Sequence, residues 1–223
     1  MALDESLLRS ALEGGVASLR FYTWTEPTLS LGYFQHFADR KPLDVAWVRR
    51  PTGGDAIMHH HEITYSLALP SGAPWHTSES WICRMHHAVA TALQSFGIAA
   101  MTVVCGEEQR LGPMLCFQHQ TPGDLLIAGH KVAGSAQRRP HGAMLQHGSI
   151  LLIQSEHAPE LPGIAELSGV DVPRVALEKA ILHSLAKDTG WSVEPSEWTQ
   201  AEREVAEQIE REKYSSPSWN EKR

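Results

Sequence analysis

The sequence predicts a single α+β domain built on a mixed, largely antiparallel sheet with helices at its flanks. Short segments of alternating apolar residues, which are typical of strands, recur along the chain between turns rich in glycine and proline. Segments with helical periodicity stand between groups of these strands and after them, instead of following each strand in turn. No linker, repeat or low-complexity block divides the 223 residues, a length that suits one large domain.

The composition is that of an ordinary soluble globular protein, with 42% hydrophobic and 20% charged residues. No apolar run approaches the ~20 residues that a membrane-spanning helix needs. The chain also begins with acidic residues where a signal peptide would carry basic ones, so we expect no membrane partner. A formal net charge of −7 disfavours nucleic acid as a partner. Three cysteines, an odd number, argue against a disulfide framework and for a reducing, cytoplasmic location.

Residues 1–100 are predicted to form two helices and four strands. Segments 3–12 and 78–96 each place apolar residues on one helical face. The predicted strands span residues 19–24, 29–34, 45–48 and 63–69, and turns with glycine or proline separate them.

The rest of the chain is predicted to hold four more strands, at 102–105, 125–128, 131–133 and 144–153. Helices are expected at 174–189 and 196–212, and residues 214–223 are expected to be a loose tail. We therefore assign residues 1–195 to the main domain and 196–223 to a C-terminal polar helix and tail.

The stretch 116–152 is the candidate for the chemistry. It holds Cys116, then Lys131 fifteen positions later, then the turn-rich segment GSAQRR and an apolar run. A lone cysteine is most often a small buried hydrophobe. It becomes a nucleophile when a nearby cation stabilises its thiolate, and Lys131 and the histidines at 119, 130, 141 and 147 are available.

The segment RRPTGGDA, residues 49–56, is the second candidate. Its backbone N–H groups are suited to surround an anionic or amide-bearing group, although an ordinary β-turn at Pro51 and the glycine pair explains the same residues. Arginine pairs at 49–50 and 138–139 suggest recognition of an anion or an acidic partner, or two solvated edges.

Three consecutive histidines, 59–61, raise the question of a metal site. The zinc-protease pattern HExxH is absent, because Tyr65 stands four positions after His61. Neighbouring side chains of a strand also point to opposite faces, so the three rings would not meet at one ion. We predict no metal.

Several motifs together resemble the lipoate/biotin protein ligase and octanoyltransferase superfamily. They are MALDE at 1–5, LSLGYFQ at 29–35, RRPTGGDAIMHHHEITYSL at 49–67, and GHKVAGSAQRR with LQHGSILL within 129–152. They recur in the family's order and span about two-thirds of the chain. The resemblance implies the α+β fold of biotin ligases and class II aminoacyl-tRNA synthetases.

Within that superfamily the chain looks like the cysteine-dependent octanoyltransferases, which carry a CF motif followed fifteen positions later by the motif lysine. Cys116-Phe117 and Lys131 match that pattern. The resemblance implies transfer of an octanoyl group from acyl carrier protein, through a Cys116 thioester, to a lysine of a lipoyl domain or of glycine-cleavage H protein. No cofactor is implied, because one thioester is exchanged for another and the final amide is stable.

The resemblance also implies roles for individual residues. Cys116 and Lys131 would be catalytic. The substrate-binding residues would be Arg49, Thr52, Gly53, Gly54, Asp55, His59, Gly134, Ser135, Ala136, Gln137, His147 and Gly148. The chain departs from the family pattern at Asp55, where a third glycine is usual, and at His60, where an aspartate is frequent.

Two other functions compete with this prediction. The first is an ATP- and Mg-dependent lipoate–protein ligase in which Cys116 is only structural. The second is a non-catalytic protein that binds the carrier or the lipoyl domain.

Overall fold

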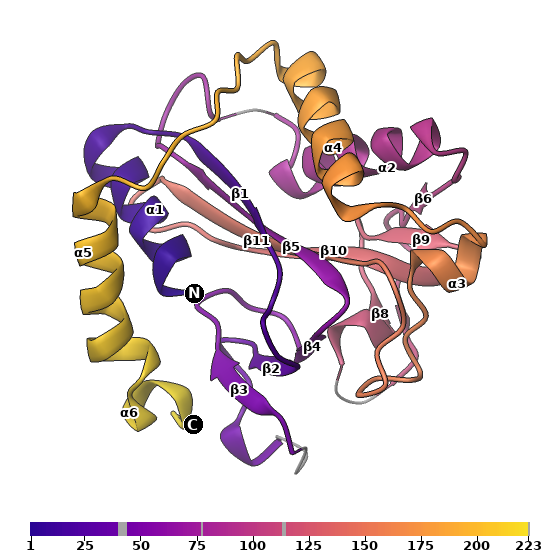
Figure 1. The fold of residues 1–223 in the computed structure, drawn as a ribbon, viewed down its shortest axis with the longest axis horizontal. Helices are drawn as coiled ribbons and strands as arrows, with labels where there is room; N and C mark the ends of the chain where they lie inside the picture. Colours follow the sequence, from indigo (N-terminus) through magenta and orange to yellow (C-terminus); the bar gives the residue numbers. More distant parts are fainter. Residues whose placement is uncertain (40–43, 77, 113–114, 223) are drawn as a thin grey trace.

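A six-stranded antiparallel sheet forms the centre of the computed structural model, which describes residues 1–39, 44–76, 78–112 and 115–222 (Figure 1). The strand order is β1-β5-β11-β10-β9-β6. These strands are β1 Ser18–Tyr22, β5 Glu62–Leu69, β6 Met101–Thr102, β9 Leu125–Ile127, β10 His130–Arg138 and β11 Met144–Leu151.

Helices pack on both faces of this sheet (Figure 1). The helices α2, Trp81–Ser95, and α4, Arg174–Thr189, enclose the main core with Leu67 and Met144 of the sheet. The helix α1, Ala2–Gly14, packs on Ala68 and Leu145 of the opposite face and is itself covered by α5, Gln200–Ile209. The two faces arise because neighbouring side chains of a strand point in opposite directions.

A second sheet of three strands, in the order β3-β2-β4, lies beside the large one. It consists of β2 Thr28–Leu31, β3 Ala46–Arg49 and β4 Ile57–His59, and the β2–β3 pair is parallel. The short strands β7, Gln109–Arg110, and β8, His119–Gln120, form a separate pair. Short helices α3, Ile164–Ser168, and α6, Pro217–Asn220, complete the fold. The prediction of an α+β fold with a mixed, largely antiparallel sheet flanked by helices is therefore confirmed.

Two local predictions are wrong. The segment GSAQRR does not form a turn, because residues 134–138 continue β10 and pair with β11. The expected loose tail is instead docked: Trp219 Nε1 donates a hydrogen bond to the carbonyl of Arg49 at 2.9 Å, and the Arg49 N–H donates to Asn220 Oδ1 at 3.0 Å. None of the helices in the described part of the chain is long and apolar enough to cross a membrane.

Candidate active site

A cavity lies over the part of the six-stranded sheet where β5 and β11 carry polar side chains, on the face that carries α1. Its floor includes Thr64 from β5 and His147 and Ser149 from β11, whose side chains share one face by alternation along the strands. Its walls come from residues 50–57, which link β3 to β4, and from residues 116–121. The cavity thus joins both segments that the sequence singled out.

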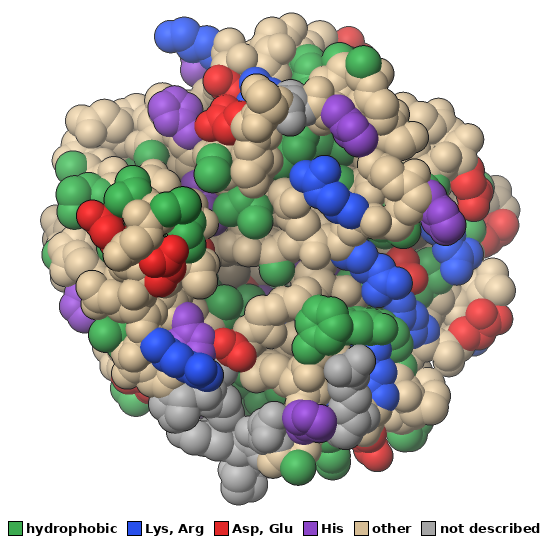
Figure 2. Space-filling model, turned by 180° about the vertical axis from the view of Figure 1, so that it is seen from behind, with side chains coloured by type: hydrophobic (Ala, Val, Ile, Leu, Met, Phe, Trp, Pro, Cys, Tyr) green, Lys and Arg blue, Asp and Glu red, His purple; other side chains and the backbone are tan. Residues whose placement is uncertain are grey.

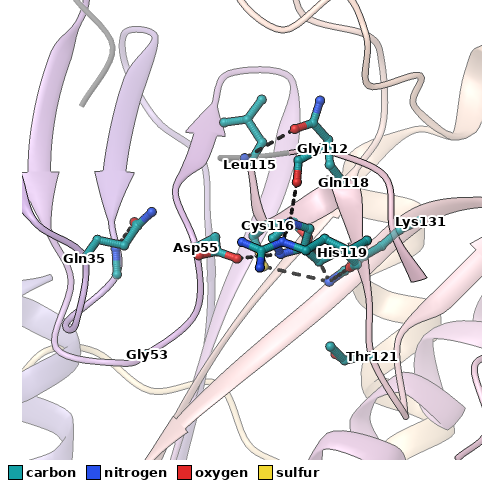
Figure 3. Close-up of polar contacts among 12 residues, drawn as sticks. Gln35, Gly53, Asp55, Gly112, Leu115, Cys116, Gln118, His119, Thr121 and Lys131 are labelled. Atoms are coloured by element: carbon teal, nitrogen blue, oxygen red, sulfur yellow. Dashed lines mark hydrogen bonds and ion pairs between the residues drawn. The ribbon is translucent and has the colours of Figure 1, made fainter. Parts of the chain in front are cut away.

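Cys116 and Lys131 face one another in this cavity (Figure 3). Cys116 begins a single 3₁₀ turn, and its backbone N–H donates to the carbonyl of Ala56 at 2.8 Å. Lys131 lies on β10, where its Nζ is 3.8 Å from the Cys116 sulfur. The same ammonium group lies 2.7 Å from Asp124 Oδ2 and donates to the carbonyl of His119 at 3.0 Å. Lys131 and Asp124 are both buried, so the lysine is held as a fixed cation beside the sulfur.

The loop that contains Gly53 and Gly54, called the glycine loop below, lies close to the sulfur of Cys116. A Cβ atom added to Gly54 would lie 3.8 Å from the Cys116 sulfur and 3.0 Å from Arg50 Nη2, and Gly54 has a φ of 87°. Arg50 Nη2 donates to the carbonyls of Gly53 at 2.8 Å and Asp55 at 2.6 Å. Burial lowers the pKa of Arg50, and the nearby Cys116 and Asp55 oppose this shift. The arginine therefore shapes the loop and places a buried cation near the sulfur.

Two buried carboxylates support the floor of the cavity. Glu62 accepts hydrogen bonds from Ser149 and from Thr64, and it pairs with His59. Burial raises the pKa of Glu62, but these partners outweigh burial and leave it below the usual value.

The second carboxylate, Asp4 of α1, contacts His147 of the floor from the face of the sheet that carries α1. Burial raises the pKa of its carboxyl, but the N-terminal ammonium, His147 and Arg20 outweigh burial and hold the pKa well below its usual range. His147 Nε2 is 3.4 Å from Asp4 Oδ2, which is longer than an ordinary hydrogen bond. Burial lowers the pKa of His147.

Most of the residues predicted for the site line this cavity. They are Thr52, Gly54, Asp55, His59, Cys116, Lys131, Gly134, Ser135, Ala136, His147 and Gly148. The Ser135 hydroxyl contacts His86 Nε2 and the Tyr65 hydroxyl, each at 2.6 Å, on the α2 side of the sheet.

Three predicted residues lie outside the lining. Gly53 contributes its carbonyl to Arg50, and Gln137 donates to Gln146 Oε1 at 2.7 Å. Arg49 donates to the carbonyls of Gly32 at 2.9 Å and Asn220 at 3.0 Å. It therefore joins the docked C-terminal tail to the loop that begins at Gly32, directly after β2, which is called the β2 loop below. Because Arg49 and Arg50 are 0% and 2% exposed, that pair is not a surface for an acidic partner, and this prediction is corrected.

The structure adds residues that the sequence did not indicate. Asp124 is the carboxylate partner of Lys131, yet it sits in a PGD turn that reads as an ordinary loop. Arg50, next to the predicted Arg49, is the arginine that lines the cavity. Among the described residues no group of three or more His, Cys, Asp or Glu side chains is arranged to hold a metal ion.

The chain is similar to several known proteins. Residues 1–158 match the lipoyl protein ligase A/B catalytic domain. The chain is 33% identical to an octanoyltransferase LipM of Kyrpidia tusciae, over 99% of this chain and 93% of that protein. It is 32% identical to an octanoyltransferase LipM of Carboxydothermus hydrogenoformans, over 98% of this chain and 92% of that protein.

Solved structures share the fold. A putative lipoate protein ligase from T. acidophilum superposes with a TM-score of 0.80 at 23% identity, covering 99% of this chain and 92% of that one. A lipoate-protein ligase A crystallised with ATP gives a TM-score of 0.81, also at 23% identity, with the same coverage.

Proposed function

This chain belongs to the lipoyl protein ligase A/B catalytic domain family, and we propose that it is a protein octanoyltransferase that works through a thioester on Cys116. The observation that carries the proposal is the Lys131 ammonium 3.8 Å from the Cys116 sulfur in a lined cavity. The curated octanoyltransferase relatives, which match almost the whole chain, support the transferase over the ATP-dependent ligase.

The first step loads the enzyme. The buried Lys131 cation stabilises the thiolate form of Cys116, and the thiolate attacks the carbonyl carbon of an octanoyl thioester on acyl carrier protein. The bond between that carbon and the carrier's sulfur breaks, and the carrier leaves with its thiol. One thioester replaces another, so neither ATP nor another cofactor is needed.

The second step unloads it. The ε-amino group of a lysine on a lipoyl domain or on glycine-cleavage H protein attacks the carbonyl carbon of the enzyme thioester. An amide forms, the bond between the acyl carbon and the Cys116 sulfur breaks, and the free sulfur is again stabilised by the Lys131 cation. Backbone N–H groups of residues 134–137 supply candidate donors to the oxyanion. Moving the octanoyl chain into the cavity contributes ~0.8 kcal/mol for each methylene removed from water.

The exposed pair Arg138-Arg139 is the remaining candidate for contact with an acidic carrier or lipoyl domain. Figure 2 shows Lys and Arg side chains gathered on one side of a hollowed face of the molecule. Because these partners are intracellular in the reaction proposed, we place the enzyme in the cytoplasm.

A transfer assay tests the function. Purified enzyme is incubated with octanoyl-acyl carrier protein and a lipoyl domain, with and without ATP. We expect octanoylation of the acceptor lysine that is independent of ATP. Modification that requires ATP and proceeds from free lipoate or octanoate would support the ligase instead. Binding of the carrier with no modification under either condition would support a non-catalytic protein.

A further inference from the structure

We propose that Asp55 forms the subsite for the ammonium group of the acceptor lysine, with His119 as the residue that positions its carboxylate. The inference rests on the proposed function and adds to it a residue that receives the second substrate. The charges around the sulfur favour such a subsite.

The cavity presents a cationic surface to an incoming lysine. Lys131 and Arg50 both line it. Lys131 is paired with Asp124, but the Arg50 guanidinium bonds only to hydroxyl and carbonyl oxygens, those of Ser30, Gly53 and Asp55, in the described part of the chain. Once Cys116 is acylated, its thiolate charge is gone, and no charge on the sulfur offsets the Arg50 guanidinium. A protonated lysine would be repelled unless an anion receives it.

Asp55 supplies that anion. It is the one acidic side chain among the cavity-lining residues that the structure describes. Its side chain is 34% exposed, so it faces both the cavity and the route from solvent. Asp55 follows Gly54, where an added Cβ atom would lie 3.8 Å from the Cys116 sulfur, so the backbone that carries Asp55 passes beside the reacting thioester.

The Asp55 carboxylate is fixed but not saturated (Figure 3). Its Oδ2 lies 2.6 Å from His119 Nδ1, and within residues 1–39, 44–76, 78–112 and 115–222 its Oδ1 has no partner. Its main chain is held as well, because Arg50 Nη2 donates to the Asp55 carbonyl. One oxygen is thus used for positioning and the other is left for a ligand that donates hydrogen bonds.

His119 connects this carboxylate to the catalytic pair. Its carbonyl accepts from Lys131 Nζ at 3.0 Å, while its ring contacts Asp55. The second ring nitrogen, Nε2, faces the Gly112 carbonyl at 2.6 Å and Arg110 Nε at 3.1 Å, which fixes the orientation of the ring. The Lys131 ammonium and the Asp55 carboxylate are therefore placed relative to one another by a single residue.

In the transfer step, Asp55 binds the lysine ammonium, which passes one proton to solvent and becomes an amine. The nitrogen lone pair forms the new C–N bond, the bond between the acyl carbon and the Cys116 sulfur breaks, and the sulfur takes the electron pair. The second proton lost from nitrogen ends on that sulfur or in solvent. The products are an amide and free Cys116.

The test separates the two half-reactions. Octanoyl-enzyme is prepared from octanoyl-acyl carrier protein and isolated, and its decay is followed by intact-protein mass spectrometry after addition of a lipoyl domain or of hydroxylamine. Hydroxylamine is uncharged at neutral pH and needs no ammonium subsite. Asp55→Asn should slow transfer to the lipoyl domain at least about tenfold, the loss of one charge-assisted contact. The rate of its reaction with hydroxylamine should remain within about twofold of the wild-type rate, a much smaller change than the tenfold loss expected with the lipoyl domain.

Matched variants complete the design. Asp171→Asn removes the same charge from an exposed position between α3 and α4 and should behave as wild type. His119→Ala should reproduce the selective loss, and His119→Asn, which keeps a donor near the Nδ1 position, should restore much of the transfer.

Three results would overturn the inference. The first is an Asp55→Asn enzyme that reacts more slowly with the lipoyl domain and with hydroxylamine by the same factor. The second is an Asp55→Asn enzyme that transfers to the lipoyl domain at the wild-type rate. The third is an equal loss of transfer rate in His119→Ala and His119→Asn. Failure of the wild-type enzyme to accept an octanoyl group at all would instead contradict the proposed function. The two failures are therefore distinguishable.

Discussion

At the scale of single residues, the Lys131–Asp124 pair sets the electrostatics of the site. The two groups are 2.7 Å apart and their side chains are 2% and 3% exposed. Asp124 also accepts from the backbone and hydroxyl of Thr121 at 2.8 and 3.0 Å, so every partner of this carboxylate is local. The pair therefore holds the Lys131 ammonium in place beside the Cys116 sulfur.

Removing that charge should be costly in two ways. Lys131→Met leaves the Asp124 carboxylate buried without a cation, and breaking such a pair costs about 3–5 kcal/mol of unfolding free energy. It should also abolish acylation of Cys116. Urea unfolding and the mass of the protein after incubation with octanoyl-acyl carrier protein measure the two effects.

The double variant Lys131→Met/Asp124→Asn provides the control, since it removes both charges and keeps an acceptor for Thr121. It should recover part of the stability but none of the acylation. Equal stability of the single and double variants would show that the pair is not a buried charge pair.

At the scale of elements, the approach of the β2 loop to the glycine loop shapes the site. A Cβ on Gly32, just after β2, would lie 1.7 Å from the Gly54 carbonyl oxygen, which no side-chain movement relieves. The backbone beside the sulfur therefore depends on a glycine more than twenty positions earlier in the chain.

Gly32→Ala should displace the loop that carries Gly54 and Asp55. We expect a loss of about 1–3 kcal/mol in unfolding free energy, the usual cost of overpacking, and acylation slowed at least tenfold. Gly14→Ala, where the added Cβ meets only Val16 at an ordinary 3.7 Å, is the matched control. A Gly32→Ala protein with wild-type acylation would contradict this account of the loop.

Element-scale prediction from sequence was good where periodicity was strong. The helix at 174–189 has its predicted bounds, and the expected strands at 63–69 and 144–153 correspond to β5 and β11.

The prediction from sequence was wrong at GSAQRR, because small residues in an interior strand look like a turn until the partner strand β11 is known. It was also wrong for the tail, which is ordered by contacts with Arg49 some 170 positions away. The Asp55–His119 contact was missed for the same reason, since long-range pairing leaves no local pattern. Asp124 was missed because it sits in a turn that looks like an ordinary loop.

At the scale of the whole molecule, two buried histidines on opposite sides of the central sheet govern the response to acid. Burial lowers the pKa of His86, behind β10, and of His147, in the cavity floor. Both are neutral in the folded protein under conditions where unfolded histidines, with a pKa of about 6.5, take up protons. Protons then bind preferentially to the unfolded state, so stability is lost as the pH falls below about 6.5.

Urea unfolding between about pH 7.5 and 5.5 should show this loss, with each histidine contributing up to about 1.4 kcal/mol per pH unit. His86→Gln should give a shallower slope. This window lies above the pH at which the lowered carboxyl pKa values of Asp4 and Glu62 matter. A stability that stays constant across the window, or a slope unchanged in the variant, would contradict the assignment.

The covalent intermediate on Cys116 is the central claim, and intact-protein mass spectrometry tests it most directly. Wild-type protein mixed with octanoyl-acyl carrier protein, without ATP or acceptor, should gain the mass of one octanoyl group. Cys116→Ala should gain none, whereas Cys105→Ala, which removes an exposed cysteine, should be loaded as wild type is. An adduct that persists in Cys116→Ala, or a wild-type protein that stays unmodified while it octanoylates a lipoyl domain, would contradict the thioester mechanism.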